Sequence, residues 1–243
     1  MTPPWLYSAI VQRGSNPLDE SEARHATSSL RLGDGDEIVL FNGSGMLGRG
    51  RLAGRAAGRR TEWTAEIQQV EHVPKPDERL TLFVAAPKGE RLDWLVEKCT
   101  ELNTAAIVLV NCERTVRKLD SSHAAKLQRV AIEAAKQCGR AWLPIIQAGA
   151  TPTTAVHAWR QASATTRLAL ADALAKQTFS AYARTDLAAR LGVLIGPEGG
   201  WSDAERDIFL TLGAEPVRLG DTILRVETAA IAVAALCEGL RDG

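Results

Sequence analysis

The chain has 243 residues, of which 45% are hydrophobic and 24% are charged, values typical of a globular protein that can bury a sizeable core. Its 29 basic residues balance 29 acidic ones, so the total charge gives no sign of a nucleic-acid partner. There is no apolar run of membrane-spanning length and no basic segment followed by an apolar one at residues 1–10, so we expect neither a transmembrane helix nor a signal peptide.

The first part of the chain has the pattern of short strands and tight turns. The apolar run at residues 37–41 is followed by Asn42-Gly43, and residues 61–70 alternate as a strand does. Residues 1–72 are therefore predicted to be mainly β, as a small barrel or sandwich. Residues 73–79, which contain two prolines and several charges, are predicted to form a linker.

From residue 80 onward, strand-length apolar runs alternate with helical patterns. Strands are predicted at 80–86, 105–110, 168–171 and 191–195, and helices at 91–102, 154–161 and from residue 120 or 121 to 137. Such alternation predicts a mostly parallel sheet with helices on both faces across residues 80–243.

A glycine-rich turn, Gly196-Pro197-Glu198-Gly199-Gly200, directly follows the strand predicted at 191–195. Ser202 and Glu205 then form an S-x-x-E capping box that predicts a helix start. Glycines at the end of a parallel strand allow a sharp turn and close approach of a ligand, although a plain connection has the same pattern. This turn is neither a G-x-G-x-x-G dinucleotide fingerprint nor a Walker A loop, which disfavours a simple nucleotide cradle here.

A second unusual stretch covers residues 219–230. Leu219-Gly220 turns the chain, Ile223-Leu224-Arg225 follows, and an alanine-rich helix is predicted from residue 227 or 228 to 238. Taken alone, the stretch is explained by a solvated Arg225 and by Glu227 complementing the helix dipole.

Together, residues 195–200, 219–220 and 223–229 resemble the C-terminal signature of RsmE-type 16S ribosomal RNA uridine-N3 methyltransferases, a family of the SPOUT superfamily. Residues 87–91, 97–102 and 133–140 resemble further blocks of the family, and His25 with residues 30–36 and 41–45 resembles its N-terminal domain. Three positions depart from the family pattern: Asn103 replaces a usual glycine, Thr222 a common arginine, and Val226 a common threonine.

The resemblance implies a PUA-like β-barrel that binds RNA at residues 1–72 and a trefoil-knotted α/β SPOUT domain at residues 80–243. It also implies a cytoplasmic homodimer and the cofactor S-adenosyl-L-methionine (SAM), held by loops near 170–173, 196–200 and 219–225. The residues expected to bind the cofactor are Gly196, Glu198, Gly199, Gly200, Leu219, Gly220, Ile223 and Leu224.

The implied reaction places a methyl group on N3 of a uridine, uridine 1498, in the 16S RNA of the 30S subunit. Because N3 reacts well only when deprotonated, the site needs a base and a group that stabilises charge on O2 and O4. Arg225 is the candidate for the second role and Glu198 or Glu227 for the base. For Arg225 a phosphate clamp or an interface ion pair is the alternative, and for Glu227 helix capping.

Basic residues gather locally despite the balanced total. The target base must be unpaired or flipped out for N3 to be reached, and basic clusters supply phosphate contacts around it. The candidates are Arg31, Arg49, Arg51, Arg55, Arg59, Arg60, Arg114, Arg117, Lys118 and Arg140.

The four histidines and four cysteines are scattered, so we expect no metal site and no disulfide framework. Two other functions are compatible with parts of the pattern. One is an RNA-binding module without catalysis, and the other is a different α/β enzyme, such as a phosphohydrolase, for which no metal or nucleophile constellation is found.

Overall fold

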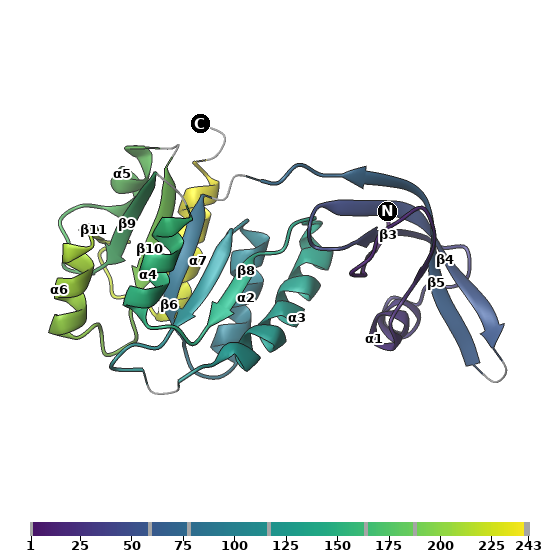
Figure 1. Ribbon diagram of the computed structural model, residues 1–243, viewed down its shortest axis with the longest axis horizontal. Coiled ribbons are helices and arrows are strands. Elements are labelled where there is room, and N and C mark those ends of the chain that lie inside the picture. Colours follow the sequence, from purple (N-terminus) through teal and green to yellow (C-terminus); the bar gives the residue numbers. More distant parts are fainter. Residues whose placement is uncertain are drawn as a thin grey trace. The chain divides into compact units, whose positions relative to one another are not determined.

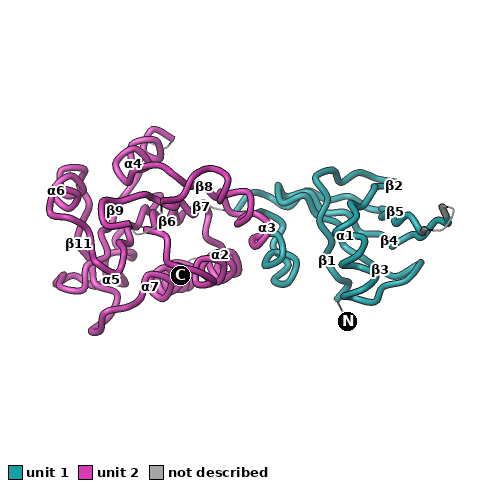
Figure 2. Tube along the Cα trace, turned by 90° about the horizontal axis from the view of Figure 1, so that it is seen from below, with its two compact units in different colours: residues 1–76, 132–143 teal, residues 77–131, 144–243 magenta. Residues whose placement is uncertain are grey.

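The computed structural model describes residues 2–57, 60–76, 79–115, 118–162, 165–186 and 189–240, and of positions 57 and 60 only the backbone. The chain divides into two compact units, residues 1–76 with 132–143 and residues 77–131 with 144–243 (Figure 2). Helix α3 (Ser121–Cys138) contributes residues to both units.

The first unit is built on a sheet with the strand order β1-β3-β4-β5-β2. Strands β3, β4 and β5 pair antiparallel in succession, and β1 runs parallel to β3. In the turn between β3 and β4, Asn42 Oδ1 accepts hydrogen bonds from the backbone N–H groups of Ser44 and Met46, as predicted for Asn42-Gly43. The elements are β1 (Trp5–Tyr7), β2 (Gly14–Pro17), α1 (Glu20–Arg24), the π-helical turn η1 (His25–Ser29), β3 (Glu37–Phe41), β4 (Met46–Ala57) and β5 (Arg60–His72).

A buried ion pair fixes the end of α3 within this unit. Lys136 Nζ lies 3.0 Å from Glu22 Oε1, and only 5% and 8% of the two side chains are exposed. Glu22 also accepts a hydrogen bond from the backbone N–H of Tyr7. Beside the pair, Phe41 packs in a buried cluster with Ala135. Residues 132–143 therefore complete the core of the first unit.

The second unit contains a parallel sheet with the strand order β11-β9-β10-β6-β7-β8 (Figure 1). Each pairing between neighbours in its described part is parallel, which confirms the predicted α/β class. The strands are β6 (Leu80–Ala85), β7 (Ala106–Val110), β8 (Ile145–Ala148), β9 (Thr166–Ala171), β10 (Arg190–Ile195) and β11 (Ala214–Val217). The helices are α2 (Glu90–Glu101), the first part of α3, α4 (Pro152–Gln161), α5 (Phe179–Arg184), α6 (Asp203–Thr211) and α7 (Val226–Glu238).

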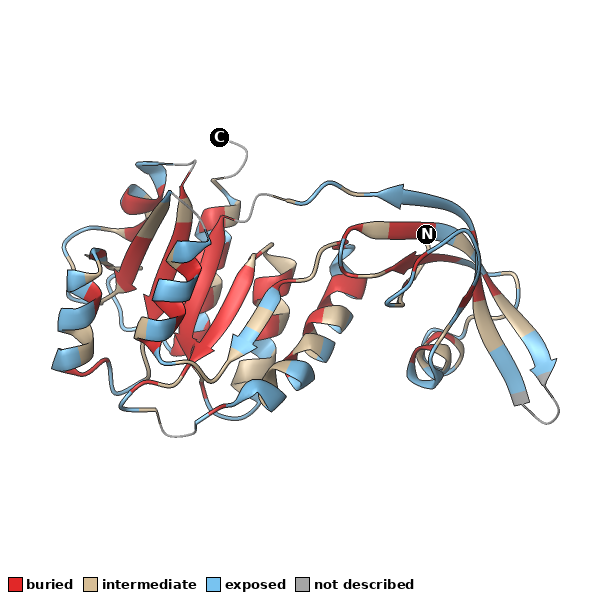
Figure 3. Ribbon diagram, in the orientation of Figure 1, coloured by how far each residue is buried: buried red, intermediate tan, exposed pale blue. Residues whose placement is uncertain are grey.

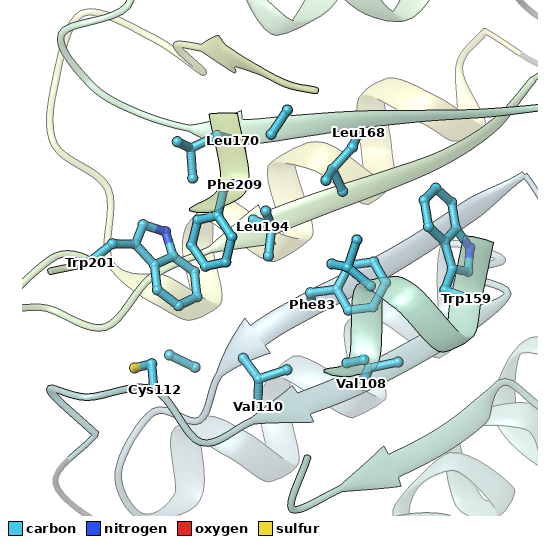
Figure 4. Close-up of a cluster of buried hydrophobic side chains, with 14 residues drawn as sticks. Phe83, Val108, Val110, Cys112, Trp159, Leu168, Leu170, Leu194, Trp201 and Phe209 are labelled. Carbon is cyan, nitrogen blue, oxygen red and sulfur yellow. The ribbon is translucent and has the colours of Figure 1, made fainter. Parts of the chain in front are cut away.

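Helices cover both faces of this sheet. Helix α4 packs on β6 and β7, and α7 packs on β6, β10 and α2. On the α4 face, Phe83, Trp159 and Leu194 belong to a buried cluster that reaches Trp201 and Phe209 (Figure 4). Strands β6 and β7 are buried along their whole length (Figure 3), which explains why, apart from Thr81, they are apolar runs in the sequence.

The capping box is present at the start of α6. The Ser202 hydroxyl accepts the backbone N–H of Glu205, and the Glu205 carboxylate accepts the backbone N–H of Ser202. Within the residues described, no helix has both the length and the apolarity to cross a bilayer. The trefoil knot is a matter of chain threading that strand order alone does not test, and it stays a prediction.

Candidate cofactor and active site

Three loops meet at one edge of the parallel sheet of the second unit. They follow β9, β10 and β11, which are neighbours in the sheet, and they line a cavity of about 330 Å³, here called the first cavity. Crevices at the carboxyl ends of parallel strands are the usual ligand sites of such sheets. The predicted residues that line it are Gly196, Glu198, Gly200, Leu219, Gly220, Ile223, Leu224 and Arg225, whereas Gly199 and Glu227 are not among its lining residues.

Gly196 is required by its neighbour within the protein. A Cβ at this position would lie 2.9 Å from Trp201 Nε1, closer than side chains normally approach. The Trp201 indole is buried and packs edge-on against Phe209 with ring centroids 4.9 Å apart. Trp201 thus forms a wall of the first cavity, and the absence of a side chain at Gly196 makes room for it.

The glycine-rich turn is held in a fixed shape. Gly200, with φ of 71°, donates its N–H to the carbonyl of Pro197 at 2.8 Å. From the loop after β7, Arg114 Nη1 donates to the carbonyls of Gly199 at 2.8 Å and Trp201 at 3.2 Å. Arg114, predicted to contact RNA phosphate, therefore braces this turn.

Two carboxylates of the site face the same cation. Arg91 Nη1, in the first turn of α2, lies 3.7 Å from Glu198 Oε1 and 3.7 Å from Glu227 Oε1. Glu198 is half exposed, but only 5% of the Glu227 side chain is exposed, and within the described part of the chain its Oε2 has no hydrogen-bond partner. Arg91 is a site residue that the sequence reasoning did not single out, although it ends the matching block at 87–91.

A further acidic residue that lines the first cavity is also held by an arginine. Asp172, directly after β9, accepts a hydrogen bond from Arg206 Nη2 of α6 at 2.7 Å. Burial raises the pKa of Asp172, but hydrogen bonds from Arg206 and from the backbone N–H of Leu174 outweigh it, so the net shift is downward. Asp172 is thus a carboxylate in a fixed orientation at the cavity wall.

Apolar and cationic groups complete the first cavity. Ile223 lines it with 88% of its surface exposed, which is unusual for so large an apolar side chain. Arg225 is exposed, lies at the N-cap of α7, and also lines the cavity. The site therefore combines apolar walls with few charged groups, as small-molecule pockets do, and its volume lies within the range of roughly 300–1,000 Å³ typical of them.

Comparison with known proteins assigns the chain to a family. A family model described as an RNA methyltransferase domain matches residues 74–238, and an RNA methyltransferase PUA domain matches residues 18–55. The ribosomal RNA small subunit methyltransferase E of Synechocystis sp. is 32% identical over 87% of this chain and 69% of that protein. The chain belongs to the ribosomal RNA small subunit methyltransferase E family. This confirms the resemblance to RsmE-type enzymes.

Two further proteins that are similar to this chain support the assignment. The protein of that name from Mycobacterium bovis is 31% identical over 88% of this chain and 82% of its own length. A structure from Legionella pneumophila, described as a methyltransferase in complex with the bound cofactor SAM, is similar with a TM-score of 0.83. That protein is 26% identical, and the match covers 98% of both chains.

Of the three positions that depart from the methyltransferase E pattern, the structure explains the one at Asn103. Asn103 has φ of 52°, a conformation that asparagine tolerates better than most residues, and its Nδ2 donates to Glu238 Oε1 at 2.7 Å. Thr222 lines the first cavity, and Val226 is buried at the start of α7. Asn103 can therefore replace glycine without loss of the turn.

The predicted RNA-binding residues differ in their surroundings. Arg49 pairs with Glu71 at 3.1 Å and Arg51 with Glu37 at 2.9 Å, so carboxylates on adjacent strands compensate these two charges. Arg140 is 8% exposed and offers little surface to a phosphate. Arg31, Arg55 and Lys118 are exposed, whereas Arg59, Arg117 and the side chain of Arg60 lie outside the described residues.

Proposed function

We propose that this protein transfers a methyl group from SAM to N3 of a uridine in 16S ribosomal RNA, uridine 1498, in the 30S subunit in the cytoplasm. The observation that carries the proposal is the meeting of the three loops after β9, β10 and β11 around the first cavity, in a chain of the methyltransferase E family. A binding module without catalysis would not need this cavity.

The residues of the first cavity suit SAM. Leu219, Ile223 and Leu224 offer apolar surface for an adenine ring. The backbone at Gly220 is open because, apart from its chain neighbours, no atom of the described residues lies within 4 Å of where a Cβ would stand. Asp172 and Glu198 are carboxylates at the wall that can accept hydrogen bonds from ribose hydroxyls or an ammonium group. When bound, SAM supplies an electrophilic sulfonium methyl group.

The chain's own groups then act on the uracil. Of the two candidate bases, we assign proton removal from N3 to Glu198, because it is half exposed and lines the cavity. We assign to Glu227, buried behind Arg91, the positioning of that arginine and through it of Glu198. To Arg225, which lines the first cavity, we assign the stabilisation of negative charge on a uracil carbonyl oxygen.

RNA binding is assigned to exposed basic residues of both units, chiefly Arg31, Arg55 and Lys118, with a contribution from Arg49 and Arg51 once their carboxylate partners are displaced. Such contacts fix affinity and register rather than sequence. A homodimer, as the family resemblance implies, is proposed as the working form. Helix α7 itself is largely buried within the chain against α2 and β6.

The decisive experiment is methyl transfer to 30S particles from cells that lack this activity, with the product mapped by mass spectrometry. N3-methyluridine at the expected nucleotide is the predicted product, and another methylated base overturns the substrate assignment. Calorimetry distinguishes the proposed enzyme from the alternative of an RNA-binding module without catalysis, because such a module gives no heat with SAM at high concentration.

The variant Arg225→Ala tests the charge-stabilising role, with the exposed Lys176→Ala as a control outside the cavity. We expect turnover to fall about 10²–10³-fold in Arg225→Ala. Unchanged turnover with weaker RNA affinity would instead identify Arg225 as a phosphate contact.

A further inference from the structure

A second cavity lies beside the first at the same edge of the sheet. It has a volume of about 330 Å³ and is lined by residues 85–89 at and after the end of β6, by residues of α2 and α3, by Thr115 and Leu119, and by Pro197 and Glu198. Pro197 and Glu198 also line the first cavity. Because β6 is the neighbour of β10 in the sheet, the Pro197-Glu198 turn after β10 is a wall that both cavities share.

We propose that the second cavity receives the unpaired target pyrimidine of the RNA, with Lys88 beside its carbonyl oxygens. The inference rests on the proposed function. Methyl transfer requires the acceptor nitrogen in line with the bond that breaks and about 3–3.5 Å from the methyl carbon. The acceptor site must therefore adjoin the cofactor site, and the shared wall provides that adjacency. The cavities described around Arg49 in the first unit share no lining residue with the first cavity.

The lining of the second cavity suits a nucleobase, which has two apolar faces and a polar edge. Leu92, Leu119, Leu127 and Pro197 provide apolar surface. Polar and charged side chains also line it and can fix the orientation of the polar edge of a ligand: Lys88, Asp93, Thr115, His123, Lys126 and Glu198. The volume accommodates a base together with its ribose, so the nucleotide must leave its stack to enter.

The charged groups of the second cavity single out Lys88. Lys126 is paired with Asp93 at 3.1 Å, and His123 contacts Asp120 at 2.9 Å. Lys88 is exposed, and among the described residues it forms no ion pair or hydrogen bond. Lys88 is therefore the cation of this cavity whose charge is not already compensated.

The start of helix α2 adds to the same effect. Gly89 lines the cavity as the N-cap of α2, with φ of 65° and no side-chain cap, so the positive end of the helix dipole lies at the cavity. Both Lys88 and this helix end favour negative charge on O2 or O4 of the bound uracil.

In the proposed reaction, the N3–H bond breaks and the proton passes to Glu198. The N3–CH3 bond then forms as the S–CH3 bond breaks, and its electron pair stays on sulfur.

Two variants test the proposal with 30S particles as substrate. Lys88→Ala removes the cation, and Leu92→Trp fills the cavity, since Leu92 is half-buried and lines it. Lys176→Ala removes an exposed lysine outside both cavities and serves as the control. We expect turnover to fall about 10²–10³-fold in Lys88→Ala and to be lost in Leu92→Trp, while the Kd for SAM changes less than about twofold and Lys176→Ala behaves as wild type.

The outcomes separate this proposal from the proposed function. If the wild-type protein binds no SAM or methylates no uridine, the proposed function fails. If the wild type is active and both variants are too, only the base pocket is refuted. A Kd for SAM that rises more than tenfold in Leu92→Trp also refutes it, because the cavity then holds part of the cofactor. Should Leu92→Trp not fold, Lys88→Ala decides, with recovery of activity in Lys88→Arg as the supporting result.

Discussion

Replacing Gly196 by alanine tests the account of the glycine-rich turn. The added methyl group would lie 2.9 Å from Nε1 and 3.0 Å from Cε2 of Trp201, so the ring must retreat by several tenths of an ångström. It has little room, because Trp201 is 7% exposed and packs against Phe209. Overpacking of this kind costs about 1–3 kcal/mol. Because Trp201 is also a cavity wall, we expect the Kd for SAM to rise about tenfold or more.

The measurement is urea unfolding followed by tryptophan fluorescence, together with calorimetric titration of SAM. Gly199→Ala is the matched stability control, because it lies in the same turn and, of the residues that the structure describes, its new methyl would meet only Arg114 Cδ at 3.8 Å. In a Trp201→Leu background the Gly196→Ala penalty should shrink by at least about 0.5 kcal/mol. Equal stabilities of Gly196→Ala and Gly199→Ala would refute the reasoning.

Three further predictions concern other parts of the chain. Lys136→Met should lower the free energy of unfolding by about 3 kcal/mol, because it leaves Glu22 buried without its cation. The double variant with Glu22→Gln should recover part of the lost free energy of unfolding. If urea unfolding shows that the losses of the two single variants simply add, the pairing is contradicted. Arg114→Ala should raise the Kd for SAM several-fold and leave the salt dependence of RNA binding unchanged. Loss of a phosphate contact would instead lower the slope of log K for RNA binding against log salt concentration by about one. Asp172, whose pKa is lowered from 3.8, should contribute stability at neutral pH that is lost as the pH falls below about 4. Acid unfolding of Asp172→Asn should then show a smaller loss than the wild type in that range, and an equal or larger loss would contradict the shift.

Local signals in the sequence were sufficient for many of the elements. The Ser202 and Glu205 pair predicted the start of α6, since both partners of a capping box lie within one helical turn. The apolar runs of β6 and β7, interrupted only by Thr81, predicted buried parallel strands. The three loops of the first cavity were expected only through the family resemblance, because their neighbourhood depends on strand order.

Local sequence patterns could not predict contacts between residues that are far apart in the chain. The arginines at 49 and 51 lie in a stretch of sequence without acids, but strand pairing brings Glu71 and Glu37 to them. Glycine at 196 was expected to admit a ligand, whereas its packing partner is Trp201. Lys136 and Glu22 are 114 positions apart. In each case the deciding partner is set by tertiary structure, which residue spacing does not contain.

The division of the chain into units also bears on its synthesis. The first unit is discontinuous, since it needs residues 132–143 in addition to residues 1–76. During translation at about 5–20 residues per second, Ile132 follows Pro76 by roughly 3–11 s. Until then Glu22 lacks Lys136, and Phe41 lacks the small side chains that cover it. The nascent β-sheet therefore stays incompletely covered while the first strands of the second unit are synthesised. During this interval a chaperone could bind its exposed apolar surface.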